Sequence, residues 1–187
     1  MRYSAGHKEQ ARKQLLTLAA NKAKQDGFGA TGIDSLAKAA GVTSGAVYSQ
    51  FGSKDKLFSE LVDTELSRSQ AYFMDKSRDK VLEGLKWYLS LSHVTEPGTG
   101  CVMPALSGEI GRALPEVRQV YEKKIKEIQQ AAKALTSDEA SSWALVAQTV
   151  GAVIIARAMD SEEGRLALLN GVLEFSERIL REQSPKT

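Results

Sequence analysis

The sequence has little besides a hydrophobic core that would stabilise a fold. Its 187 residues include one cysteine, two histidines and four prolines. One cysteine cannot form an internal disulfide, and His7, His93 and Cys101 lie too far apart in sequence for a zinc-ligand cluster. We therefore expect no metal and no other cofactor. A chain of this length buries roughly two-thirds of the surface that it exposes when unfolded, so its core alone suffices.

Long apolar runs are also lacking. No apolar segment typical of a signal peptide follows the first residues. The most apolar run, residues 143–156, is shorter than the ~20 residues of a membrane-spanning helix. The sequence therefore predicts a cytoplasmic protein that makes no contact with a membrane.

Alternation of apolar and polar residues, the pattern of β-strands, is nearly absent, whereas apolar residues recur at helical spacing along the whole chain. The pattern predicts an all-α fold. We expect about nine helices, over residues 5–25, 33–40, 44–50, 53–73, 76–93, 102–113, 115–134, 138–158 and 161–182.

Local signals indicate where several of these helices begin and end. Gly27 supplies a left-handed stop after the first helix. Thr31 with Asp34, and Thr136 with Glu139, have the spacing of capping boxes.

The charge is unevenly distributed. Residues 1–60 carry nine Lys and Arg against five Asp and Glu, a net charge of +4, whereas residues 61–187 carry sixteen against eighteen, a net charge of −2. A basic N-terminal part joined to a slightly acidic remainder is typical of a small nucleic-acid-binding unit attached to a second unit.

Residues 33–51 have the pattern of a helix-turn-helix. Such a motif needs a small residue where two helices cross, a glycine at the turn and an apolar residue on the second helix, and Ala37, Gly41 and Val47 meet these needs. A plain helical hairpin is the alternative for this pattern alone.

The surrounding residues extend the match. Residues 11–62 resemble the DNA-binding domain of the TetR/AcrR family of bacterial transcriptional regulators. The resemblance rests on Gly27-Phe28, Ala30-Thr31, Leu36-Ala37, Ala40-Gly41-Val42, Gly45-Ala46-Val47-Tyr48, Phe51-Gly52-Ser53-Lys54 and Leu57. It implies a helix-turn-helix DNA-binding domain over residues 1–53 and a helical effector-binding and dimerisation domain over residues 54–187.

The resemblance and the residue chemistry together suggest which side chains contact a double-stranded DNA operator. Short polar or backbone-exposing residues at the start of the second motif helix suit base edges in the major groove, and these are Thr43, Ser44 and Gly45. Phosphate contacts are expected from Thr31, Tyr48, Gln50 and Lys54. The family usually has a histidine where this chain has Gln50, so a contact there would come from an uncharged amide.

A palindromic operator needs two copies of the recognition helix about one DNA turn, ~34 Å, apart, so we expect a homodimer. The last two helices are apolar on more than one stripe, which favours them as the interface over the alternative of core helices in a monomer. The candidate interface residues are Val150, Gly151, Ile154, Leu169, Val172, Leu173 and Phe175.

The resemblance also implies a pocket for a small-molecule effector whose binding releases DNA. The candidate lining residues are Trp87, Tyr88, His93, Cys101, Met103, Tyr121 and Trp143. Cys101 precedes a helix that has Pro104 in its first turn, a position that tends to lower a thiol pKa. Some family members detect oxidants or electrophiles through a similar Gly-Cys arrangement, so thiol-based sensing is an alternative.

The sequence also bears on two other functions. The sequence has no Ser/His/Asp arrangement, metal-ligand spacing or phosphate-binding loop, and His93 has no identifiable catalytic partner, so a small all-α enzyme is disfavoured. Activation in place of repression stays open, because the position of the operator decides the outcome. The sequence thus predicts a ligand- or stress-responsive repressor without enzymatic activity.

Overall fold

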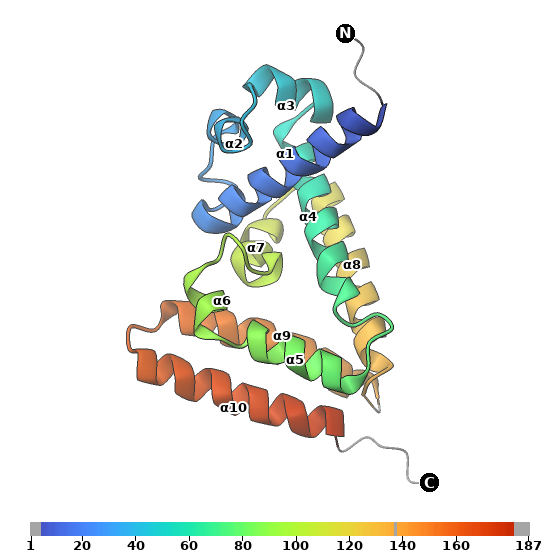
Figure 1. The fold of residues 1–187 in the computed structure, drawn as a ribbon, viewed down its shortest axis with the longest axis vertical. Helices are drawn as coiled ribbons and strands as arrows, with labels where there is room; N and C mark the ends of the chain where they lie inside the picture. The colour runs from blue at the N-terminus through green and yellow to red at the C-terminus, as the bar shows by residue number, and fades with distance from the viewer. Residues whose placement is uncertain (1–4, 137, 182–187) are drawn as a thin grey trace.

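The computed structural model describes residues 5–136 and 138–181, and this part of the chain forms ten α-helices and no strand (Figure 1). The helices are α1 (Ala5–Asp26), α2 (Ile33–Ala39), α3 (Ser44–Phe51), α4 (Lys54–Ala71), α5 (Arg78–Tyr88), α6 (Leu91–Thr95), α7 (Val102–Ile110), α8 (Pro115–Lys133), α9 (Glu139–Ala158) and α10 (Glu162–Arg181). The all-α prediction is confirmed.

Helices α1 to α3 form a head at one end of the molecule (Figure 1). From the head, α4 and α8 run side by side toward the opposite end, where α5, α9 and α10 lie across the base. Helix α7 lies between the head and the base and contacts α1, α4, α8 and α9. The main helix contacts between the body, α4 to α10, and the head are those of α4 and α7.

The turn between α2 and α3 forms as its sequence predicts. Gly41 has φ +70°, and the N–H groups of Gly41 and Val42 donate to the carbonyls of Lys38 and Ala37, which is a Schellman ending. Thr43 then caps α3, because its hydroxyl accepts from the Ala46 N–H at 3.2 Å.

Both predicted capping boxes were wrong. Helix α2 is capped by the backbone of Gly32, while the Thr31 hydroxyl turns back and donates to the Gly27 carbonyl at 2.6 Å. Helix α9 is capped by Asp138, whose carboxylate accepts from the Ser141 N–H at 2.7 Å. In both places a neighbouring residue completes the cap and the threonine bonds to a carbonyl instead.

The helix expected over residues 76–93 is interrupted. Helix α5 ends at Tyr88, and Ser90 caps the short α6 by accepting from the His93 N–H. This break accounts for the tenth helix. It also brings the His93 ring back toward α5, where it bonds to the Tyr88 carbonyl.

Helix α9 is long and apolar enough to cross a membrane, which the shorter apolar run had not suggested. It contacts α6, α7, α8 and α10, as the core helix of a helical body does. One helix that meets this criterion is weak support for a membrane span.

One hydrophobic cluster joins the head to the body. It includes Phe28, which stacks on Phe58 with ring centroids 4.0 Å apart, and it continues through α4 to Leu106 and Ile128. The cluster thus crosses the predicted domain boundary at residue 53, and packed side chains connect α4 and α7 with the head.

Candidate functional site

The outer surface of α3 presents short and polar groups. Thr43, Gly45, Tyr48 and Gln50 are exposed, and the Tyr48 ring is 48% exposed. Ser49 is exposed as well and follows Gly45 by one helical turn. It was not among the predicted contacts, although helical spacing would have found it.

Three other predicted DNA contacts have partners within the chain. The Ser44 hydroxyl donates to the Asp34 carboxylate, and the Lys54 ammonium lies 4.9 Å from the centroid of the Phe28 ring. Thr31 is buried. The exposed face of α3 therefore offers more free polar groups than the N-terminus of α2 does.

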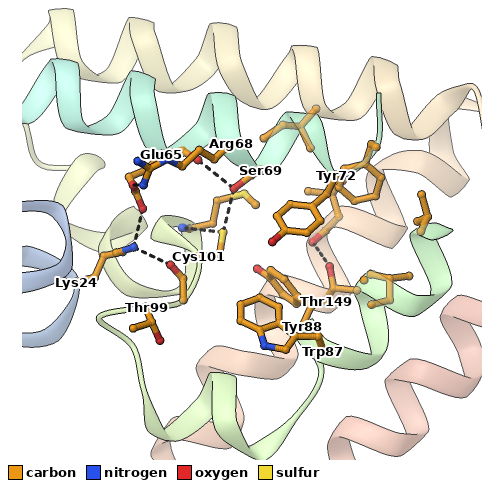
Figure 2. Close-up of a pocket in the computed structure, with 18 of the residues that line it drawn as sticks. Lys24, Glu65, Arg68, Ser69, Tyr72, Trp87, Tyr88, Thr99, Cys101 and Thr149 are labelled. Atoms are coloured by element: carbon orange, nitrogen blue, oxygen red, sulfur yellow. Dashed lines mark hydrogen bonds and ion pairs between the residues drawn. The ribbon is translucent and has the colours of Figure 1, made fainter. Parts of the chain in front are cut away.

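A cavity of about 270 Å³ lies in the body beneath the head (Figure 2). Residues from α1, α4, α5, α8, α9 and the start of α7 line it, together with the segment that precedes α7. Of the predicted lining residues, Trp87, Tyr88, Cys101 and Met103 border this cavity.

The other three predicted lining residues lie elsewhere. His93 is buried against the rings of Trp87 and Tyr88 and supports the wall without bordering the cavity. Tyr121 bonds to the Ser107 hydroxyl at 2.9 Å, and Trp143 is 37% exposed on α9. The spacing of aromatic residues in the sequence thus predicted only part of the cavity wall.

Charged residues that were not predicted from the sequence form one end of the cavity. The buried Lys24 ammonium donates to the Glu65 carboxylate at 2.6 Å and to the Gly100 carbonyl at 2.8 Å, and Arg68 pairs with the other oxygen of Glu65 at 2.6 Å. These contacts join α1, α4 and the segment before α7. The available signal was a charged residue on an apolar stripe, since Glu65 follows the core residue Leu61 by one turn.

His93 holds the wall behind the cavity. Its Nε2 accepts from the Cys101 N–H at 2.9 Å, so Nδ1 carries the proton that bonds to the Tyr88 carbonyl at 2.7 Å. Burial lowers the pKa of His93, and the neighbouring Arg157 and Lys24 also lower it. The ring is therefore neutral at pH 7 and fixes Cys101 relative to α5.

Cys101 caps α7, and its Sγ accepts from the Met103 N–H at 3.4 Å and lies 3.5 Å from the Ser69 hydroxyl. The expectation of a lowered thiol pKa was wrong. Burial raises the pKa of Cys101, and the hydrogen bonds from Ser69 and Met103 offset only part of that rise. The group that borders the cavity is a protonated thiol.

Tyr88 presents an unsatisfied group to the same cavity. Its phenol oxygen is buried and has no hydrogen-bond partner. Burial, and after it the neighbouring Cys101 thiol, raise the pKa of Tyr88 well above its ordinary value. The phenol therefore keeps its proton. The Cys101 thiol beside it is only a weak acceptor, so the hydroxyl can still donate to a ligand.

The far end of α7 contacts the head. The Glu109 carboxylate accepts from the N–H groups of Phe28, at 3.0 Å, and of Gly29 in the α1–α2 turn. A Cβ at Gly27 or Gly29 would come within about 3 Å of this carboxylate, so glycine is what allows the approach. One short helix thus connects the cavity wall to the head.

The outer face of α9 and α10 is apolar and uncovered. Ile154 and Phe175 are 45% and 46% exposed, and a Cβ at Gly151 or Gly171 would meet nothing within 4 Å. Val150, Gly151, Val172 and Leu173 are partly buried. Leu169 is fully buried within the chain, so it is a core residue and not a surface residue of this face.

Among the described residues, no group of three His, Cys, Asp or Glu side chains is arranged to hold a metal ion.

The head is similar in sequence to known proteins. The family described as "Bacterial regulatory proteins, tetR family" matches residues 15–61. The HTH-type transcriptional regulator AcrR of Shigella flexneri is 43% identical over 61 residues, which are 33% of this chain and 27% of that protein. The match thus spans about a quarter of the relative's length.

Solved structures match the fold of nearly the whole chain. A TetR transcriptional regulator from Legionella pneumophila has a TM-score of 0.74 at 17% identity, covering 97% of this chain and 100% of that one. The reduced form of Escherichia coli NemR has a TM-score of 0.73 at 21% identity, covering 95% and 100%. FadR from Bacillus subtilis in complex with stearoyl-CoA has a TM-score of 0.67 at 16% identity, covering 92% and 100%. The head, residues 15–61, is thus similar in sequence to the tetR family of bacterial regulatory proteins, and nearly the whole chain is similar in fold to these solved structures.

Proposed function

We propose that this protein is a cytoplasmic transcriptional repressor that binds a palindromic DNA operator as a homodimer and is released by a small-molecule effector. The observation that carries the proposal is the exposed face of α3, which stands on a helix-turn-helix whose turn and cap form as the motif requires. A head over residues 1–53 would read the operator, and a body over residues 54–187 would dimerise and bind the effector.

Base contacts are proposed for Thr43 and for the backbone at Gly45, which are exposed at the N-terminal end of α3. Phosphate contacts are proposed for Tyr48, Gln50 and Lys54. A base contact is also proposed for Ser44, once its hydroxyl leaves the Asp34 carboxylate. For Thr31, whose side chain is buried, only a backbone contact is consistent with its position.

The α9–α10 face supports the proposed homodimer. A helix pair that leaves Ile154 and Phe175 exposed beside open glycines gains stability when a second copy covers it. Because this face lies at the base, far from the head, pairing there leaves both α3 helices free for two half-sites (Figure 1).

The route from effector to DNA is proposed to run through α7. Cys101 and Met103, at its start, border the cavity, and Glu109, near its end, holds the α1–α2 turn. The Lys24–Glu65 pair adds a second connection from the cavity to α1. A ligand that shifts the start of α7 would therefore change how the head is held, and with it the spacing of the two α3 helices.

Thiol-based sensing through Cys101 is the second candidate, favoured by the position of the thiol at the cavity wall. The raised pKa of Cys101 argues against it, because the thiolate is the reactive form. A Cys101→Ser protein should still release DNA with the effector. If peroxide or a reactive aldehyde releases DNA from the parent protein but not from Cys101→Ser, sensing through the thiol is established.

The test of the proposed function is selection of bound duplexes from random DNA with the full chain. We expect enrichment of a palindrome whose half-sites are about one helical turn, ~34 Å, apart. Enrichment of an unpaired motif, or of none, would overturn the proposal.

A further inference from the structure

The cavity has an aromatic end and a charged end. Figure 2 shows Tyr72 and Tyr88 facing one another on one side of the cavity, with Trp87 beside Tyr88, and Lys24, Glu65 and Arg68 on the other side. Apolar side chains complete the aromatic end, among them Phe73, Val81, Leu85, Ile128 and Val146. A ligand that fills this space has a flat apolar body and a polar group at one end.

The charges at the polar end do not cancel. Lys24, Arg68 and Glu65 are the charged residues that border the cavity within the described part of the chain, so its lining carries one net positive charge. The two cations share the single carboxylate. A ligand with one negative charge would neutralise the lining, whereas a cationic ligand would add to the imbalance.

Hydrogen-bond donors are also left over. An ammonium group has three N–H donors, and the buried Lys24 has two partners, Glu65 and Gly100. The buried phenol of Tyr88 makes no hydrogen bond of ordinary length and has only the weakly accepting Cys101 thiol beside it. A buried donor without a partner costs free energy, which a ligand acceptor would recover.

We infer that the cavity binds a small aromatic acid, with one or two fused rings against Tyr72, Trp87 and Tyr88. Its carboxylate accepts from the Tyr88 hydroxyl and faces the charged end of the cavity. This inference rests on the proposed effector role of the cavity and names the chemical class of the effector. The burial of the Tyr88 oxygen makes its bond to an anion stronger than a bond in water would be.

The experiment measures binding to the full chain without DNA, by isothermal titration calorimetry, with three probes of one shape: 2-naphthoate, 2-naphthamide and naphthalene. We expect 2-naphthoate to bind at least ten-fold more tightly than the other two. Tyr88→Phe, which keeps the ring, should weaken 2-naphthoate at least ten-fold and leave naphthalene unchanged. Tyr121→Phe is the matched control, because its hydroxyl bonds to Ser107 outside the cavity lining.

Equal or tighter binding of the amide or of naphthalene, no binding of any probe, or full 2-naphthoate affinity in Tyr88→Phe would overturn the inference. Operator release is measured separately. If 2-naphthoate binds as expected but releases no DNA, the ligand class stands and the proposed effector role fails.

Discussion

The head and the body of this protein resemble known proteins in different ways. The family match covers residues 15–61, whereas the body is matched only in fold, by structures that are 16–21% identical over the chain. A helix-turn-helix that binds DNA meets the same kind of partner, the major groove of a duplex, in different proteins, so its residues are constrained by that partner. A cavity meets a partner of its own, so its function has to be argued from its contacts.

The strongest test of how the two regions are joined is removal of the buried ion pair. Lys24→Met leaves the Glu65 carboxylate in the core with only Arg68 as its partner, and we expect a loss of about 3–5 kcal/mol in the free energy of unfolding. Urea denaturation measures it. The double variant Lys24→Met/Glu65→Met should recover most of the loss. Equal stability of the single and double variants would show that the pair does not join the regions.

The second test separates binding from release. Glu109→Ala leaves the N–H groups of Phe28 and Gly29 without their acceptor, and we expect a loss of about 1–3 kcal/mol in the free energy of unfolding. The variant should bind effector normally, while effector should change its operator affinity less than in the parent. Glu122→Ala, an exposed glutamate on α8, is the control and should leave both properties unchanged. If the effector lowers the operator affinity of Glu109→Ala as much as that of the parent, α7 is not part of the proposed route.

These two tests concern contacts that the sequence could not reveal. Gly41 and Thr43 were predictable because turn and cap chemistry depends on neighbouring residues. Lys24 and Glu65 are 41 positions apart, and Glu109 is 80 positions from Gly29, so only the folded chain pairs them. Thr31 failed as a cap for a local reason, because its hydroxyl donates to the Gly27 carbonyl four residues earlier, an acceptor that the capping-box pattern did not consider.

A third test concerns the body alone and uses pH. The pKa of His93 is lowered in the fold, so the unfolded chain takes up a proton more readily as the pH falls below about 6.5. The stability that His93 contributes is therefore present above pH 6.5 and is lost as the pH falls through the lowered pKa. Urea midpoints at pH 7.5 and 5.5 should differ more in the parent than in His93→Gln. His7→Gln, which replaces the other histidine, should keep the parent's difference; an equal difference in His93→Gln would contradict this role.

The smallest expected effect concerns the head alone. Lys54→Ala removes one proposed phosphate contact, so binding to all duplexes should weaken similarly, and the slope of log K against log salt should flatten by about one. Titrations at several salt concentrations measure it. Lys80→Ala, on α5 of the body, should leave the slope unchanged. An unchanged slope in Lys54→Ala would mean that Lys54 only packs on Phe28.

The most direct measurement is a titration of the selected palindromic duplex, and of the same duplex with one half-site scrambled, monitored by fluorescence anisotropy and analytical ultracentrifugation. Two recognition helices on one dimer predict two chains per palindrome and at least hundred-fold weaker binding to the scrambled duplex at the same salt concentration. Equal affinity for the two duplexes, or one chain per palindrome, would contradict a homodimer that reads a palindromic operator.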